Sequence, residues 1–145
     1  MTEAKNVPNV IDVIQQDHLE IEALLARVAD PGTDGRDAAF DELAALLAKH
    51  EAAEEAVVRP AMEKIDGAEA EARDLEEAKA DEMLERLRTM EVGSSEFEAA
   101  FAKFRSSVLT HAKHEEAEEH PKLEANLEAG RLADLGQDFV RAEED

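Results

Sequence analysis

Residues 97–115 read FEAAFAKFRSSVLTHAKHE, and the spacing of this stretch decides the fold. The apolar side chains at positions 97, 101, 104 and 108 are separated by four, three and four residues. That spacing places them on one face of an α-helix. His111 and Glu115 continue it by three and then four residues. The stretch therefore predicts an amphipathic helix whose inward face ends in two polar side chains.

The end of this helix has a second copy earlier in the chain. HAKHEEAEEHP at 111–121 and HEAAEEAVVRP at 50–60 both follow the pattern H-x-x-x-E-E-A-x-x-x-P. In the earlier copy, apolar residues at 40, 43 and 47 lead to His50 and Glu54. Each copy therefore presents a histidine and a glutamate four residues apart, which face the same way on a helix.

The apolar faces of two further predicted helices also include inward polar residues. Apolar residues at 10, 11, 14, 21, 24, 25 and 28 make one helix face, and His18 fills the vacant place on it. In the third helix, Leu84 and Leu87 lie on the apolar face, and two turns back along that face lies Glu77, with Asp81 between. The helical pattern is interrupted at EVGSSEF, and Ser94 or Ser95 is expected to cap the next helix.

These patterns predict an all-α protein. A chain of 145 residues fits one domain, here 1–145, and its Ala- and Leu-rich composition without Trp or Tyr suits helices. Helices are expected at about residues 8–29, 36–65, 68–91 and 95–128, with Gly67 ending the second, and a short C-terminal helix at about 131–142. Short connections favour an antiparallel up-down-up-down four-helix bundle with the last helix lying over it.

The charge of the chain restricts its partners. With 37 acidic and 16 basic residues the net charge is -21, which repels nucleic acid and anionic membranes and attracts cations. Cysteine is absent, so metal ligands must be imidazole and carboxylate, which favour iron, manganese or zinc. MTEAKNVPNV does not resemble a signal peptide, and no apolar run reaches the roughly 20 residues of a membrane span. We expect a cytoplasmic protein, either a monomer or a weak homo-oligomer.

The inward polar residues suggest a dinuclear metal site. Burying several carboxylates without a cation costs several kcal/mol per charge. The alternative is a buried hydrogen-bond network, or side chains that point outward. His114 is expected either to contact a ligand from outside or to lie at the surface, His120 is expected at the surface, and Glu55, Glu116, Glu118 and Glu119 on the solvated face. The candidate ligands are His18, His50, Glu54, Glu77, Asp81, His111 and Glu115.

QQDHLEIEALL, HEAAEEAVVRPAM and HAKHEEAEEHPKL resemble the hemerythrin-like, or HHE cation-binding, domains. The resemblance implies two iron ions, although other divalent metals are possible. It further implies two carboxylate bridges, an oxo or hydroxo bridge and an open position for O2, peroxide or nitric oxide. Carried over, His18, His50 and His111 match terminal ligands, and Glu54 and Glu115 match the bridges.

The third helix departs from the family pattern, because LEEAKADEMLERL contains no histidine where one or two are expected. When Leu84 and Leu87 are aligned with the apolar positions of the family, Glu77 falls at the histidine position and Asp81 lies one turn further on. If this alignment is shifted by a few residues, Glu76 or Glu82 is the next candidate ligand. Arg59 also replaces the aromatic residue that often precedes the proline.

Three functions remain open at this point. The leading hypothesis is a di-iron protein that binds or reacts with O2, peroxide or nitric oxide in a protective or sensing role. Turnover of a catalase-like or ferroxidase-like kind is compatible with it. The second hypothesis is an iron or divalent-cation storage module without catalysis. The third is a degenerate bundle that serves as a metal-free interaction scaffold.

Overall fold

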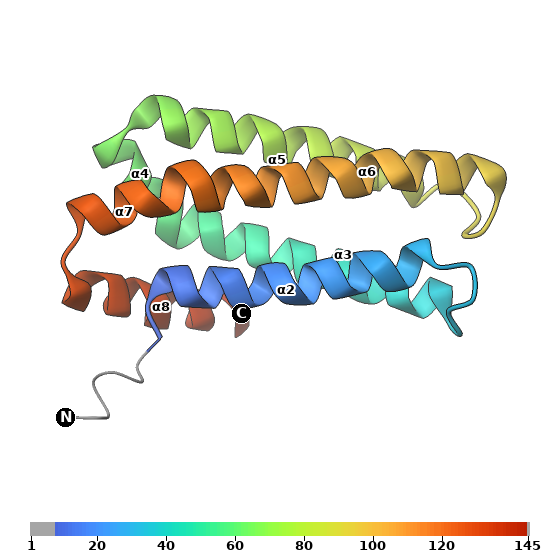
Figure 1. The fold of residues 1–145 in the computed structure, drawn as a ribbon, viewed down its shortest axis with the longest axis horizontal. Coiled ribbons are helices and arrows are strands. Elements are labelled where there is room, and N and C mark those ends of the chain that lie inside the picture. The colour runs from blue at the N-terminus through green and yellow to red at the C-terminus, as the bar shows by residue number, and fades with distance from the viewer. Residues whose placement is uncertain (1–7, 145) are drawn as a thin grey trace.

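The computed structural model describes residues 8–144, and every regular element in that range is a helix. Four long helices run alternately up and down the bundle, with α2 beside α3 and α5 beside α6 (Figure 1). The last helix, α8, lies along α2 and α3. The all-α helical bundle is therefore confirmed for this part of the chain. The elements are α2 (Val10–Ala29), α3 (Arg36–Ala53), η1 (Glu54–Val58), α4 (Arg59–Ile65), α5 (Gly67–Leu87), α6 (Ser95–His114), η2 (Glu115–Glu119), α7 (His120–Asn126) and α8 (Ala129–Glu144).

The helix ends follow local capping chemistry. The Ser94 side chain accepts the backbone N–H of Phe97, so the first of the two candidate serines caps α6. Gly67 does not end the second helix as expected. The Asp66 carboxylate accepts the N–H of Glu69 and caps α5 instead, so Gly67 is the first residue of α5. The third helix ends at Leu87 rather than near residue 91, because three-residue turns replace α-helical hydrogen bonding after it.

Two prolines modify the helices beside the candidate site. Pro60 and Pro121 have no N–H to donate, and their rings crowd the carbonyl four residues back. The chain responds with a π-turn before each proline, in which the N–H of Arg59 bonds to Glu54 O and that of His120 to Glu115 O. Each turn spans five residues, so the inward positions after it move about one residue along the chain relative to a regular α-helix.

The core consists of two apolar clusters with a polar band between them. The cluster toward the loops at 30–35 and 88–94 contains Phe40, Phe97, Phe101 and Phe104 among its members. The cluster at the opposite end joins the start of α2 to α4, α7 and α8, and includes Phe139. In sequence, the candidate ligands His18 and His50 fall where one cluster gives way to the other. Polar side chains at this level are therefore sealed from water on both sides.

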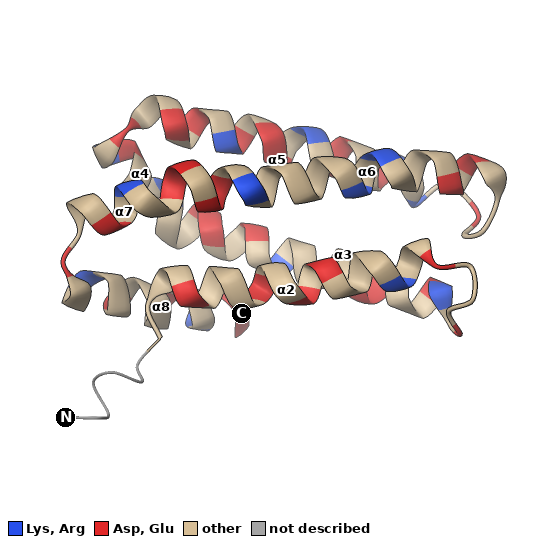
Figure 2. Cartoon of the chain, in the orientation of Figure 1, with Lys and Arg blue, Asp and Glu red and all other residues tan. Residues whose placement is uncertain are grey.

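The outer surface is strongly acidic. Acidic residues occur along all four long helices rather than on one face (Figure 2). Within residues 8–144, no helix combines the length and apolarity that a membrane crossing requires.

Candidate metal centre

Three histidines from three helices converge with their Nε2 atoms directed inward. His18 Nε2 lies 3.0 Å from Glu115 Oε1, and His50 Nε2 lies 3.5 Å from Glu54 Oε2. His111 Nε2 lies 3.3 Å from an oxygen of both Glu77 and Glu115. All three imidazoles therefore face the same set of buried carboxylates.

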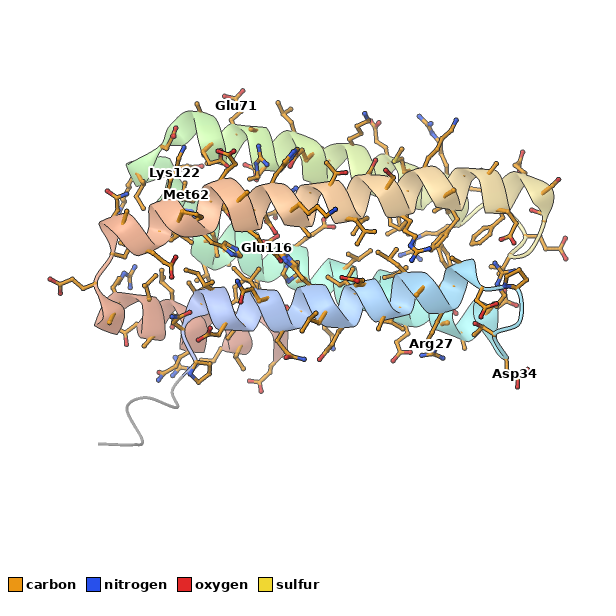
Figure 3. All side chains as sticks on the ribbon, viewed as in Figure 1. Arg27, Asp34, Met62, Glu71, Glu116 and Lys122 are labelled. Atoms are coloured by element: carbon orange, nitrogen blue, oxygen red, sulfur yellow. The ribbon has the colours of Figure 1, made fainter. Side chains whose placement is uncertain are left out.

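The Nδ1 atom of each histidine contacts a further carboxylate, farther from the centre. Nδ1 of His18 lies 2.7 Å from Glu116 Oε2, Nδ1 of His50 lies 2.8 Å from Asp17 Oδ2, and Nδ1 of His111 lies 2.8 Å from Glu76 Oε1. Glu116, labelled in Figure 3, reaches across from η2 toward α2. A carboxylate on Nδ1 fixes the ring orientation and leaves Nε2 available to a cation, as in metal sites.

Glu115 occupies the centre of this arrangement. Its side chain is fully buried, and its two oxygens face different histidines: Oε1 faces His18 and Oε2 faces His111. Glu54 is also fully buried, and neither of its carboxylate oxygens has a hydrogen-bond partner. Glu77 is buried as well and leaves Oε1 without a partner.

Among the described residues, three groups of side chains could each hold a cation, because ligand atoms within each group lie within 4.8 Å of one another. Two of the groups share Glu115 and form the candidate centre, while the remaining group contains Asp17 and Glu143 beside His50. Asp81 belongs to none of them, because it is exposed on α5 and lines a surface groove with Glu51. The two groups of the centre are His18, His50 and Glu115, and Glu54, Glu77, His111 and Glu115.

The buried charges alter one another's protonation. Burial raises the pKa of Glu54 well above its usual value, and repulsion from Glu115 and Glu77 adds to this. Burial acts the same way on Glu115, but contacts with Glu54, His111 and His18 outweigh it and hold its pKa well below the usual value. Burial lowers the pKa of His111, yet Glu115, Glu77 and Glu76 raise it to about 11. The raised pKa values of Glu54 and His111, together with the charge of Arg59, favour offsetting the buried negative charge, which metal ions would do in their place.

A cluster of carboxylates that the sequence patterns did not reveal surrounds Arg59. This residue is 3% exposed, and its guanidinium lies against the carboxylates of Glu77, Glu119 and Asp74. Burial disfavours the charge of Arg59, but Glu54, Glu119, Glu77 and Glu115 raise its pKa above the usual value.

Two expectations about the second motif copy were wrong. Glu119 is fully buried rather than solvated, and His120 is 2% exposed rather than at the surface. The π-turn at Glu115–Glu119 rotates both residues inward, which extrapolation of a regular helix does not predict. Burial lowers the pKa of His120 to about 4, so this imidazole is neutral near pH 7, and neither ring nitrogen has a partner. Its ring stacks on that of His18 at 6.3 Å between centroids.

The other surface expectations agree with the structure. His114 is 44% exposed and contacts Glu76 through Nδ1. Glu55, Glu116 and Glu118 are exposed, although Glu116 also orients His18. The carboxylates Asp17, Glu76 and Glu116 each adjoin a candidate ligand in sequence, and this adjacency was the available signal for them.

A small cavity of about 30 Å³ opens beside the candidate ligands. Its polar wall includes His18, His50 and His111, and its apolar wall includes Ile21, Leu47 and Val108. This volume is enough for one water-sized species, since a water molecule needs at least roughly 10–15 Å³. A ligand that enters the centre from this side must therefore be very small.

The residues present fit a metal ion. Both oxygens of fully buried Glu54 and Nε2 of His111 make only ion-pair contacts of 3.3–3.9 Å and no hydrogen bond, which is costly for buried polar atoms and would be relieved by a bound cation. Three imidazoles and three carboxylates, with no thiolate, form a donor set suited to iron, manganese or zinc. The profile of the hemerythrin HHE cation-binding domain matches residues 9–123.

The chain belongs to the hemerythrin HHE cation-binding domain family. The matched range of this HHE domain contains all seven candidate ligands as well as Arg59, Glu119 and His120. Helix α8 lies outside the matched range, although it packs against α2 and α3. Searches of curated proteins and of solved structures found no match.

Proposed function

We propose that this HHE domain holds two iron ions and reacts with O2, peroxide or nitric oxide in a protective or sensing role. The observation that carries the proposal is the placement of Glu115, whose two oxygens face two histidines in two separate groups. A carboxylate in that position is suited to bridge two cations. The small cavity, which has room for about one water-sized species, supports a very small ligand over a larger organic one.

The roles of the residues follow from their contacts. His18 and His50 would hold one ion and His111 with Glu77 the other, while Glu54 and Glu115 would bridge. Asp17, Glu76 and Glu116 would orient the imidazoles, because each contacts an Nδ1 atom. When bound, iron supplies a Lewis acid and a source of electrons for a small oxidant. The protein excludes water through the two apolar clusters around the polar band.

A cation-binding module without turnover is the second candidate. It is favoured by the three carboxylates around His111, because anionic oxygen ligands stabilise ferric iron over ferrous and so favour retention of an oxidised ion.

The test loads the protein with ferrous iron without air, then exposes it to air and measures metal content and the absorption spectrum. Two irons per chain with near-ultraviolet bands of a bridged ferric pair are expected, whereas one iron or none would refute the proposal. Oxygen evolution after addition of peroxide would show turnover, and its absence in the loaded protein would favour the second candidate.

Two alanine variants test the third helix. Glu77→Ala is expected to lose one iron, because Glu77 is buried among the candidate ligands. Asp81→Ala is the matched control on the same helix and is expected to keep both, because Asp81 is exposed. The reverse result would assign the third-helix ligand to Asp81.

A further inference from the structure

Arg59 places a permanent positive charge inside one half of the candidate metal centre. Its Nη2 lies 2.6 Å from Glu77 Oε2, 3.5 Å from Glu115 Oε2 and 3.9 Å from Glu54 Oε1. These three carboxylates belong to the same candidate group as His111. Because a guanidinium is not deprotonated in proteins, the charge persists at every pH at which the bundle folds.

The guanidinium is also held from outside the cluster. Nε donates to Asp74 Oδ1 at 2.7 Å, and Nη1 donates to Glu119 Oε2 at 3.0 Å. With Nη2 donating to Glu77, each of its three nitrogens has a carboxylate partner. The planar fork therefore cannot turn away from Glu77 without breaking several charge-assisted hydrogen bonds.

The other half of the centre has a different composition. Among the described residues, Asp17 and Glu116, which contact the Nδ1 atoms of His50 and His18, form no ion pair with an arginine or lysine. Arg59 reaches this half only through Glu115 and Glu54, the two carboxylates proposed to bridge. A cation that binds His18 and His50 thus competes with Arg59 only for those shared carboxylates, whereas a cation on the His111 side also competes for Glu77 Oε2, which lies 2.6 Å from Arg59 Nη2.

We propose that Arg59 is a positioning and selectivity residue that makes the two cation positions unequal. The position at His18 and His50 fills first and tightly. The position at Glu77 and His111 fills second and more weakly, because the guanidinium repels a divalent ion a few ångströms away and competes for the same lone pairs. Before metal binds, the same guanidinium supplies counter-charge to the buried carboxylates. The inference rests on the proposed two-cation function.

The test is a calorimetric titration of the whole chain with manganese(II), together with the electron paramagnetic resonance spectrum at each step. Wild type is expected to bind two ions with dissociation constants that differ by at least about tenfold. Spin-coupled pairs should form only in the second step. In Arg59→Met the second dissociation constant should fall by about tenfold or more, and the first should change much less.

Two further variants show whether the effect comes from the positive charge at position 59, from the shape of the arginine side chain or from the net charge of the whole chain. Arg59→Lys keeps a positive charge and should keep two unequal steps. Arg36→Met removes the same charge from an arginine at the start of α3, which pairs with Glu98 rather than with a candidate ligand or a residue that orients one. Its second step should match that of wild type. Circular dichroism identifies any variant that does not fold.

The outcomes are distinct. Two manganese(II) binding steps with equal dissociation constants in wild type would overturn the role of Arg59 and still support a two-cation site. This result does not depend on any variant. A folded Arg59→Met with wild-type steps also overturns it. No manganese binding at all overturns the proposed function together with this inference.

Discussion

Gly136 offers a sharp test of how α8 is seated on the bundle. A Cβ atom built at this residue would lie 2.8 Å from Pro8 O, 2.9 Å from the carbonyl carbon of Asn9 and 3.0 Å from Val10 N. All three contacts are backbone atoms at the start of α2, which cannot rotate aside as a side chain can. Gly136→Ala must therefore push α8 away from α2.

Two effects of opposite sign set the size of the change. Alanine is favoured over glycine in a helix by about 1 kcal/mol. Overpacking at a well-packed contact costs about 1–3 kcal/mol. A shift of α8 also begins to expose Leu132, Leu135 and Phe139, which are buried on the face beside Gly136 and contribute about 1.5–3 kcal/mol each when fully buried. We expect a net loss of about 2 kcal/mol in the free energy of unfolding.

Urea denaturation followed by far-ultraviolet circular dichroism measures this loss. Gly130→Ala is the matched control, because Gly130 lies in the same helix and its Cβ would meet nothing within 4 Å. The control should gain about 0.5 kcal/mol from helix propensity. If Gly136→Ala proved as stable as the control, the close approach of α8 to α2 would be refuted.

Three other predictions concern the metal centre and its surroundings. Asp17→Asn should weaken manganese(II) binding by about 10- to 100-fold, because Asp17 orients His50, and unchanged affinity in a titration would contradict that role. Burial and then Asp81 raise the pKa of Glu51 from 4.5 to about 9, so its stabilising effect is complete below about pH 4.5 and is lost as pH rises through about 9. Glu51→Gln should therefore lose less stability than wild type between pH 7 and pH 9 in denaturation curves, and parallel curves would contradict the shift. Manganese(II) at about 100 times its dissociation constant should raise the free energy of unfolding by about 2.7 kcal/mol per site, reversibly with a chelator, and an unmoved midpoint would contradict specific binding to the folded state.

The helices could be predicted because their inward residues recur at helical spacing. The seam from Phe97 to Val108 continues through His111 to Glu115, and the structure buries Glu115 completely at its end. Each of these positions depends only on counting along one regular helix. Whether these side chains bind metal stays a prediction.

The same counting failed after the second π-turn. Glu119 and His120 lie beyond Glu115, where a five-residue turn changes the phase of the helix. Counting along the helix made no prediction for Arg59, which follows the first π-turn. The prolines are visible in the sequence. Whether the helix forms a kink or a π-turn before each proline depends on which side chains each conformation would bury.

By itself, the sequence determined which segments are helical and the inward direction of His18, His50, Glu54, His111 and Glu115, because these are properties of single helices, and the short connections between them indicated the bundle class. Only the tertiary structure decided which partners those residues meet. It set Asp17, Glu76 and Glu116 against the imidazoles and Arg59 against Glu77. Charges on different helices interact across a few ångströms, and the spacing of residues along one helix does not encode these distances. The competition between the Arg59 guanidinium and a cation for the buried carboxylates is therefore a property of the assembled bundle.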